Sequence, residues 1–165
     1  LYELCEKYLI KMERKTHHPD EEPHTCGDAE VMILGLGRFG GAIFDLMNRN
    51  EIKSAGFDSN TDLVKKFIKK KRRAAFADAE DPGFWSKLRF GKLRVIILAL
   101  PEYEAQKRSI IQARKYGFDG KIIVPSRTKE DTNELEVLGA DIIFDAYEAA
   151  AIGISDSLVK NIGDS

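Results

Sequence analysis

Apolar residues along this chain fall into short runs that alternate with stretches of helical periodicity. The runs predict strands at 31–34, 53–57, 74–77, 94–100, 121–124 and 141–144. Between them, apolar spacing and helix-end residues predict five helices. The first ends near residue 48, and the others span 61–71, 83–88, 101–116 and 128–138. Such alternation is typical of parallel sheets covered by helices on both faces. We therefore predict an α/β fold, a Rossmann-like doubly wound parallel sheet of about six strands.

Both ends of the chain lie outside this alternation. Apolar positions share one helix face in residues 1–15, and residues 16–29 are polar with two prolines and a glycine. Residues 1–29 therefore predict a helix and a linker, and the start at Leu1 leads us to expect a missing upstream part. We assign 30–146 to the sheet domain. Residues 147–165 predict a helix that docks on its own sheet or extends to a second copy; its apolar stripe is Ala150, Ile154, Leu158 and Ile162.

A glycine turn follows the first predicted strand and opens the first helix. It reads Gly-Leu-Gly-Arg-Phe-Gly from Gly35 to Gly40. Gly35 allows a tight turn, Gly37 lets a pyrophosphate approach the backbone, and Gly40 lets the helix pack close to the strand. The helix N-terminus adds unpaired N–H groups and a positive dipole end. This predicts a dinucleotide-binding βαβ unit, although the motif alone would suit any dinucleotide protein.

An acidic residue ends the second predicted strand. Asp58 lies 18 residues after Gly40, where this fold places an acid on the ribose hydroxyls. An acid there accepts from the 2′- and 3′-OH groups and repels a 2′-phosphate, which favours NAD(H) or an adenine nucleotide over NADP. Asp58 or Ser59 would also suit the cap of the next helix, and the two roles are compatible.

Composition narrows the function classes. The 165 residues carry a formal net charge of −1, so no global field draws the chain to nucleic acid or anionic lipid. The basic run at 65–73 suits a solvated helix C-terminus, and no nucleic-acid partner is predicted. Two cysteines make no disulfide framework, which favours a reducing compartment. No apolar run approaches the ~20 residues of a membrane span. Irregular spacing favours a solvated linker over a metal site for His17, His18, His24 and Cys26.

Four features together resemble the RCK/KTN (TrkA-N type) domain, a nucleotide-binding regulator of potassium channels, potassium uptake systems and cation:proton antiporters. They are the Gly-x-Gly-Arg-x-Gly turn, Asp58 after the second strand, Asp78-Ala79 after the third, and Gly139-Ala-Asp141 before the last. The resemblance covers about residues 30–150. Ala77 stands where the family usually has glycine.

The resemblance implies a cytoplasmic regulatory domain at the inner face of the membrane, joined to a transporter domain in the same or a partner chain. It also implies a homodimer formed through the C-terminal helix. We expect NAD(H) or AMP to bind where the strand order reverses, with Arg38 and Arg127 available to phosphate. The predicted site is Gly35, Leu36, Gly37, Arg38, Phe39, Gly40, Asp58, Ser59, Asp78, Ala79, Ala99, Leu100 and Arg127.

The alternative function is a small NAD-dependent oxidoreductase. Hydride transfer needs a proton donor near the nicotinamide and a place for the substrate. All three histidines precede the fold, and no substrate domain is evident. Tyr103 and Lys107 have the Tyr-x-x-x-Lys spacing of short-chain dehydrogenases, but they open the helix after the fourth strand instead of lying further along the chain. A regulator needs only differential affinity for two conformations, so we favour a non-enzyme.

Overall fold

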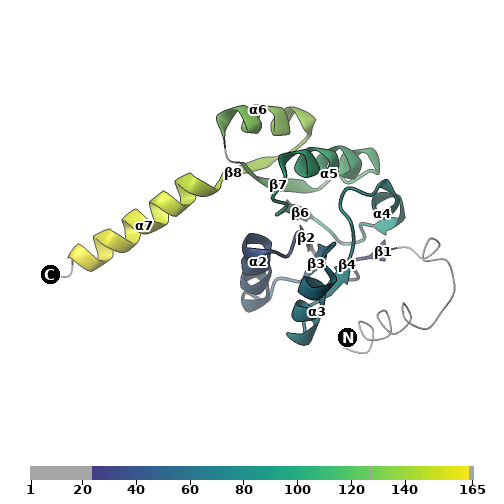
Figure 1. The fold of residues 1–165 in the computed structure, drawn as a ribbon, viewed down its shortest axis with the longest axis horizontal. Helices are drawn as coiled ribbons and strands as arrows, with labels where there is room; N and C mark the ends of the chain where they lie inside the picture. Colours follow the sequence, from purple (N-terminus) through teal and green to yellow (C-terminus); the bar gives the residue numbers. More distant parts are fainter. Residues whose placement is uncertain (1–23, 127, 164–165) are drawn as a thin grey trace.

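A parallel sheet forms the centre of the molecule. The computed structural model describes residues 24–126 and 128–163. Six strands lie in the order β4-β3-β2-β6-β7-β8, and every neighbouring pair is parallel (Figure 1). The predicted doubly wound parallel sheet is confirmed. The strands are β2 (Val31–Leu34), β3 (Ser54–Asp58), β4 (Ala74–Phe76), β6 (Val95–Leu98), β7 (Lys121–Ser126) and β8 (Ile142–Asp145).

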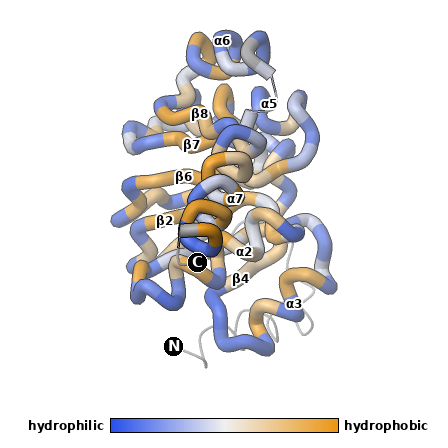
Figure 2. The backbone as a smooth tube through the Cα atoms, turned by 90° about the vertical axis from the view of Figure 1, so that its left-hand side faces the viewer, coloured by the Kyte–Doolittle hydropathy of each residue, from blue (hydrophilic) through white to orange (hydrophobic). Residues whose placement is uncertain are grey.

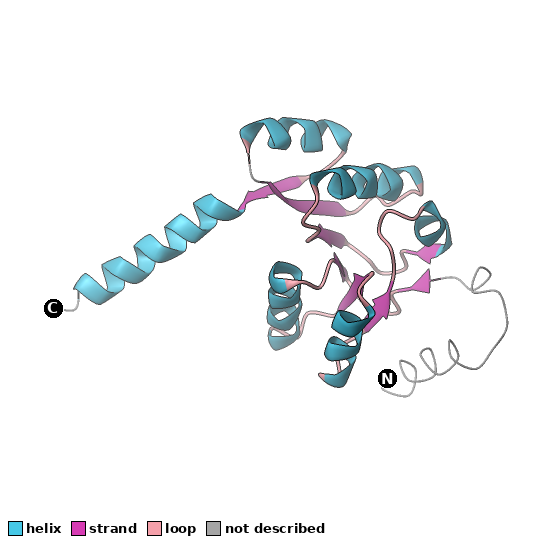
Figure 3. Cartoon of the chain, viewed as in Figure 1, coloured by secondary structure: helices cyan, strands magenta, loops and turns pink. Residues whose placement is uncertain are grey.

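Helices cover the two faces of the sheet unequally (Figure 3). One apolar cluster joins α2 and α3 to β2, β4 and β6 through Phe44, Val64 and Phe67. A larger cluster on the other face contains Trp85 of α4, Ile110 of α5 and Leu135 of α6. The helices are α2 (Arg38–Arg49), α3 (Thr61–Lys69), α4 (Pro82–Lys87), α5 (Tyr103–Lys115), α6 (Lys129–Leu138) and α7 (Ala146–Gly163).

Strand β2 lies between both layers, and its burial reflects this. All four of its residues are buried, with Val31 and Ile33 in the cluster under α2 and α3 and Met32 and Leu34 in the other. Such a strand reads as a continuous apolar run. The chain passes from β2 to β3 and β4, then returns across β2 to β6. The strand order therefore reverses between β2 and β6, where ligands bind in this architecture.

The structure contradicts part of the predicted linker. Strand β1 (His24–Thr25) pairs in parallel with β5 (Leu88–Arg89), and neither of these short strands was predicted. Cys26 and Ala29 are each 1% exposed and belong to the larger core cluster. The linker prediction is wrong for residues 24–29 because its small apolar side chains reach the core. The helix predicted at 1–15 lies outside the described residues.

Helix α7 leaves the body of the molecule (Figure 1). It contacts β8, and every residue from 150 to 162 is exposed, so the helix does not dock on its own sheet. Figure 2 looks toward α7 and shows hydrophobic positions recurring along it. No helix in the described part of the chain is long and apolar enough to cross a membrane.

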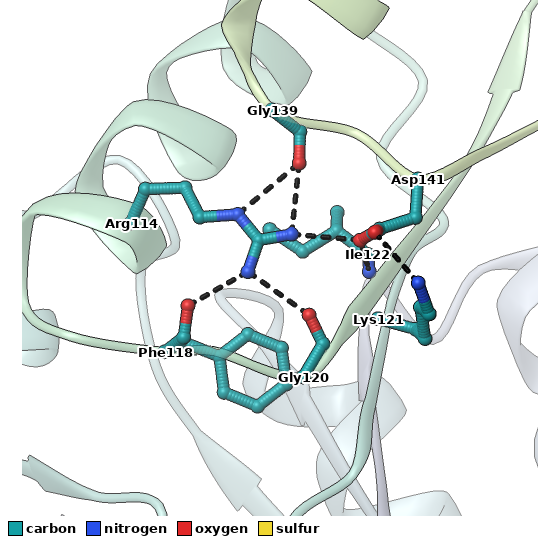
Figure 4. Close-up of polar contacts among 7 residues, drawn as sticks. All are labelled: Arg114, Phe118, Gly120, Lys121, Ile122, Gly139 and Asp141. Atoms are coloured by element: carbon teal, nitrogen blue, oxygen red, sulfur yellow. Dashed lines mark hydrogen bonds and ion pairs between the residues drawn. The ribbon is translucent and has the colours of Figure 1, made fainter.

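The Gly-Ala-Asp segment before β8 is held by a guanidinium group (Figure 4). Arg114, on α5, donates to the carbonyls of Phe118 and Gly120, to the Gly139 carbonyl, and to Asp141 at 2.7 Å. Asp141 also accepts the backbone N–H of Ile122 at the start of β7. This motif therefore fixes the amino ends of β7 and β8, far along the strands from the reversal edge.

Candidate functional site: a cleft at the reversal of strand order

A cleft of about 700 Å³ lies at the carboxyl ends of the central strands. Its volume is within the range of small-molecule and cofactor sites. Strands β2, β3 and β6 each end at its wall, with Gly35, Asp58 and Ala99 as the first residues beyond or at those ends. Ten of the thirteen predicted residues line it: Gly35, Gly37, Arg38, Phe39, Asp58, Ser59, Asp78, Ala79, Ala99 and Leu100.

The glycine turn brings two backbones together. Gly35 has φ +93°, and a Cβ there would lie 2.6 Å from the Ala99 carbonyl oxygen. A Cβ on Gly40 would collide with the Gly35 carbonyl oxygen and press on Ala99. Gly40 is buried and does not line the cleft, so it acts in close helix–strand packing, as its position in the motif predicts.

Gly37, unlike Gly35 and Gly40, faces open space. A Cβ there would meet nothing within 4 Å, because the residue is exposed at the cleft. Gly37 is also the N-cap of α2, and no side chain caps that helix. The first N–H groups of a helix have no intrahelical acceptor. With Arg38 and Phe39 exposed beside them, these donors form a site suited to phosphate.

Asp58 ties the turn to the second strand. Its Oδ2 accepts the Leu36 N–H at 2.6 Å, and its Oδ1 accepts the Asn60 N–H at 2.7 Å. A carboxylate offers about four lone-pair sites, so each oxygen retains capacity for a ligand hydroxyl. The predicted cap role of Asp58 or Ser59 is wrong: Asn60 caps α3, and its side chain accepts from Asp62 N and Leu63 N.

Two predicted residues do not line the cleft, and a third is outside the described part of the chain. Leu36 is 1% exposed, so its side chain belongs to the core while its N–H serves Asp58. Gly40 is the packing glycine described above. Arg127 lies outside the described residues, and its phosphate role stays a prediction. The sequence motif predicts the whole glycine turn, but the backbone conformation determines which of its residues face the cleft.

The loop after β4 forms the second wall. Asp78 Oδ1 accepts the Glu80 N–H at 2.9 Å, while the Ala79 carbonyl accepts from Trp85 Nε1 at 2.8 Å. Both alanines of this wall, Ala77 and Ala79, are buried. The described non-glycine residues with positive φ are Glu51 and Lys71. Ala77 therefore adopts its place without the strain that would make glycine necessary.

Sequence reasoning missed the far side of the cleft. Gln106 is 6% exposed, and its Nε2 donates to the Leu100 carbonyl at 2.8 Å and the Pro125 carbonyl at 3.3 Å. It thereby joins the ends of β6 and β7. A glutamine on the buried face of α5 was the signal that could have found it. The other members of this wall are Glu102, Pro125, Ser126, Ala146 and Tyr147.

The Tyr-x-x-x-Lys pair is engaged outside the cleft. Tyr103 donates its hydroxyl to Glu134 on α6 at 2.6 Å, and Lys107 pairs with the same carboxylate at 2.7 Å. The hydrogen bond to Glu134 raises the pKa of Tyr103 to about 12. Neither residue lines the cleft. The pair is a surface link between α5 and α6.

Of the candidate metal ligands, the structure describes the side chain of Cys26. His17 and His18 lie outside the described residues. Cys26 Sγ is buried and lies 3.8 Å from Met32 Sδ, and burial raises the pKa of its thiol to about 12. Over residues 24–126 and 128–163, no three metal-binding side chains are grouped for an ion.

The family model of the TrkA-N domain matches residues 31–146. This chain belongs to the TrkA-N domain family. A protein named as a K+ efflux antiporter, KefB of Alkalimonas amylolytica, is 25% identical over 130 residues, or 78% of this chain and 20% of the relative. The Ktr system potassium uptake protein C of Bacillus subtilis is 25% identical over 133 residues, 80% of this chain and 60% of the relative. The TrkA-N chain thus spans less than two thirds of either relative.

Solved structures share the TrkA-N fold. The NAD(P)-binding domain of an exopolyphosphatase-related protein from Archaeoglobus fulgidus has a TM-score of 0.74 and 17% identity, covering 80% of this chain and 98% of that one. The Kef C-terminal domain of Shewanella denitrificans in its AMP-bound form has a TM-score of 0.65 and 15% identity (86% and 83%). The GsuK channel bound to NAD has a TM-score of 0.63 and 15% identity (86% and 26%).

Proposed function

We propose that this TrkA-N domain binds NAD(H) or AMP in its cleft and thereby gates a potassium or cation:proton transporter. The observation that carries the proposal is the pairing of an uncapped helix start at Gly37 with the Asp58 carboxylate across one cleft. The helix start suits phosphate and the carboxylate suits ribose hydroxyls. The transporter would lie in the same or a partner chain, with the domain at the cytoplasmic face of the inner membrane.

Charge at the cleft favours ligands with few phosphates. Its described lining includes one cation, Arg38, and four acids, Asp58, Asp78, Glu80 and Glu102. Like charges close together are unfavourable, so a triphosphate or an added 2′-phosphate would meet repulsion there. NAD(H) and AMP carry less negative charge than ATP or NADPH. Structural neighbours bound to NAD and to AMP support the same choice.

An uncovered face of the sheet supports the proposed homodimer. In the β7–β8 register, Ile123 pairs with Ile142 and Pro125 with Phe144. Ile123 packs on the cluster under α2 and α3, so its neighbours share that face, yet Ile142 and Phe144 are 48% and 43% exposed. Contiguous exposed apolar surface marks interaction sites. The apolar side of a partner's α7 would cover this face, and α7 here would do the same in return.

Gating follows if the two nucleotide states differ in their effect on the dimer. The first turn of α7 touches the cleft, since Ala146 and Tyr147 line it. Asp145 fixes this helix start by accepting the N–H groups of Tyr147 and Glu148 at 2.9 Å. A ligand that binds one arrangement of α7 more tightly shifts the population toward it. No catalytic group is required.

The Tyr-x-x-x-Lys pair does not supply the oxidoreductase alternative with a proton donor in the cleft. Tyr103, its best candidate, donates to Glu134 and has a raised pKa, whereas an acid catalyst works best with a pKa near the operating pH. Turnover of NADH with carbonyl substrates, lost in Tyr103→Phe, would favour this alternative.

Calorimetry tests the proposal. NADH, NAD, AMP, ATP and NADPH are titrated in turn into the chain, and then into Asp58→Ala. Binding of NAD(H) or AMP that weakens at least tenfold in the variant supports the proposal. Failure of all five to bind at millimolar concentration contradicts it.

A further inference from the structure

The charges of this chain are divided between the two ends of the sheet. We name the amino-end face from the segments that lead into the strands, 24–30, 46–53, 66–73, 87–94, 112–121 and 135–141. These segments hold fifteen Lys and Arg and six Asp and Glu. The described segments that leave the strands toward the cleft, 35–41, 58–64, 77–84, 99–106, 128–132 and 145–149, hold two Lys and Arg and eleven Asp and Glu. A net charge of −1 thus conceals a strong separation.

Two acids of the amino-end face are each shared between two cations. Asp28 pairs with Lys53 at 2.8 Å and Arg73 at 3.0 Å. Asp141 pairs with Arg114 at 2.7 Å and Lys121 at 3.1 Å. Each of these groups keeps one net positive charge. The same holds for a third group around Asp45 of α2, formed with Lys70 and Arg72.

Further cations of the amino-end face are exposed and make no ion pair with an acid in the described part of the chain. They extend across three connections of the sheet, from α2 to β3, from α3 to β4 and from α4 to β6, so the positive charge is spread over the face instead of lying along one helix. They are Arg49, Lys66, Lys69, Lys71, Arg89, Lys92 and Arg94.

Helix dipoles explain the charges at the ends of α2 and α3, since cations are favoured at helix C-termini. Their sum still produces a field. Helix α2 has 12 residues and is ~18 Å long, whereas the screening length at physiological salt is ~8 Å. The acidic end is therefore too far away to cancel the basic one for a partner that approaches the amino-end face.

We propose that the amino-end face binds the anionic phospholipid headgroups of a membrane, which turns the nucleotide cleft away from the bilayer. The chain enters the domain on this side: β1 leads to Asp28, which is clamped by Lys53 and Arg73. An upstream membrane part would therefore arrive on the basic side. The face consists mainly of helix ends and turns, and its β1–β5 ribbon has two residues in each strand, too short to follow a nucleic-acid groove. This inference rests on the proposed transporter attachment but uses a different surface from the cleft.

Vesicle co-sedimentation of the chain tests this surface. The probes are vesicles of phosphatidylcholine alone and of phosphatidylcholine with an equal part of phosphatidylglycerol. Lys69→Gln/Lys71→Gln removes two unpaired charges, and Arg108→Gln/Lys160→Gln removes two exposed charges elsewhere on the molecule. A basic residue near an anionic surface contributes about fivefold to binding, so the first variant is expected to lose about 20-fold and the second less than twofold.

The expected result is binding to the phosphatidylglycerol vesicles alone, which falls as salt rises and persists against inorganic phosphate at the same phosphate concentration. Equal binding to both vesicle types, or equal loss in both variants, would overturn the proposal. Tighter binding to duplex DNA than to vesicles at matched phosphate concentration would reassign the face to nucleic acid. Calorimetric titration of NADH and AMP into the same samples measures nucleotide binding separately, so failure of the membrane proposal is distinguished from failure of the nucleotide-binding proposal.

Discussion

The Leu36 backbone N–H lies 2.6 Å from Oδ2 of Asp58, so the carboxylate at the end of β3 holds the glycine turn that follows β2. One side chain therefore serves both the fold and the cleft. A substitution at Asp58 alters the turn as well as any ribose contact, and the variants below are chosen to separate these effects.

Asp58→Asn should change nucleotide preference with little effect on folding. The amide oxygen can still accept the Leu36 N–H, and the exposed Asn60 N–H, which loses its acceptor, can turn to water, so we expect the free energy of unfolding to fall by about 1 kcal/mol. Loss of the negative charge removes the repulsion of a 2′-phosphate, so the ratio of NADH to NADPH affinity should fall about tenfold. Denaturant titration and calorimetry measure the two effects. An unchanged ratio would remove Asp58 from the ribose site.

Two of the three glycines of the turn, Gly37 and Gly40, should respond in opposite ways. Gly37→Ala should leave the free energy of unfolding within about 1 kcal/mol, because its methyl group enters open space, yet weaken nucleotide binding at least tenfold. Gly40→Ala should lower the free energy of unfolding by about 2 kcal/mol or more, because its Cβ collides with the Gly35 carbonyl. Chemical denaturation and calorimetry of both variants check this. Wild-type affinity in Gly37→Ala would place the phosphate elsewhere.

Arg114→Ala should destabilise the fold without involving the cleft. The change leaves the carbonyls of Phe118, Gly120 and Gly139 without their guanidinium donor. Asp141 loses one of its two cations and keeps Lys121. Hydrogen bonds to a charged group predict a loss of roughly 2–3 kcal/mol in the free energy of unfolding. Lys115→Ala, an exposed neighbour, is the control and should stay within about 0.5 kcal/mol. A loss in the control as large as in Arg114→Ala would argue against the network.

Acid should weaken the fold partly through Asp28. Hydrogen bonds from Lys53 and Arg73, with the first the larger cause, lower the pKa of Asp28 to about 2 from an ordinary value of 3.8. Because the folded pKa is the lower one, the carboxylate stabilises the fold above pH 3.8, and this contribution is lost as pH falls toward 2. Melting temperatures of wild type and Asp28→Asn should differ at pH 6 and converge near pH 2. A constant difference would show that the pairing contributes nothing.

Leu158→Glu should abolish the dimer while leaving the monomer folded. Leu158 is 54% exposed on α7, so a charge there costs the single chain little. The same charge would have to be buried in the proposed contact with the β7–β8 face of a partner. Sedimentation velocity should show a monomer for this variant and a dimer for wild type and for Lys160→Gln. A wild-type monomer at high concentration would refute the dimer.

Most of the fold could be predicted from the sequence because short apolar runs alternate clearly with stretches of helical periodicity. Strand β2 has the predicted bounds, and α7 was expected from its apolar stripe. The β1–β5 pair was not predicted because strands of two residues are too short to show a hydrophobic periodicity. The burial of Cys26 was not predicted because a single small residue in a polar stretch gives no sign of burial.

The candidate site likewise contains residues that the sequence predicts and residues that only the three-dimensional structure brings together. The turn at Gly37 and the acid at Asp58 were found because motif spacing encodes them. The wall of Gln106 and Tyr147 was not, because it arises where β6, β7 and α7 meet in space. The capping role moved from Asp58 to Asn60 because the Asp58 carboxylate is turned toward Leu36.

The central claim is that the cleft recognises NAD(H) or AMP through Asp58 and the helix start at Gly37. Its most direct test is calorimetric titration of NADH and AMP into wild type and Asp58→Ala under identical conditions. We predict binding to wild type that weakens at least tenfold in the variant while the variant stays folded by circular dichroism. Absence of binding to wild type at millimolar nucleotide, or equal affinity in the folded variant, would contradict the claim.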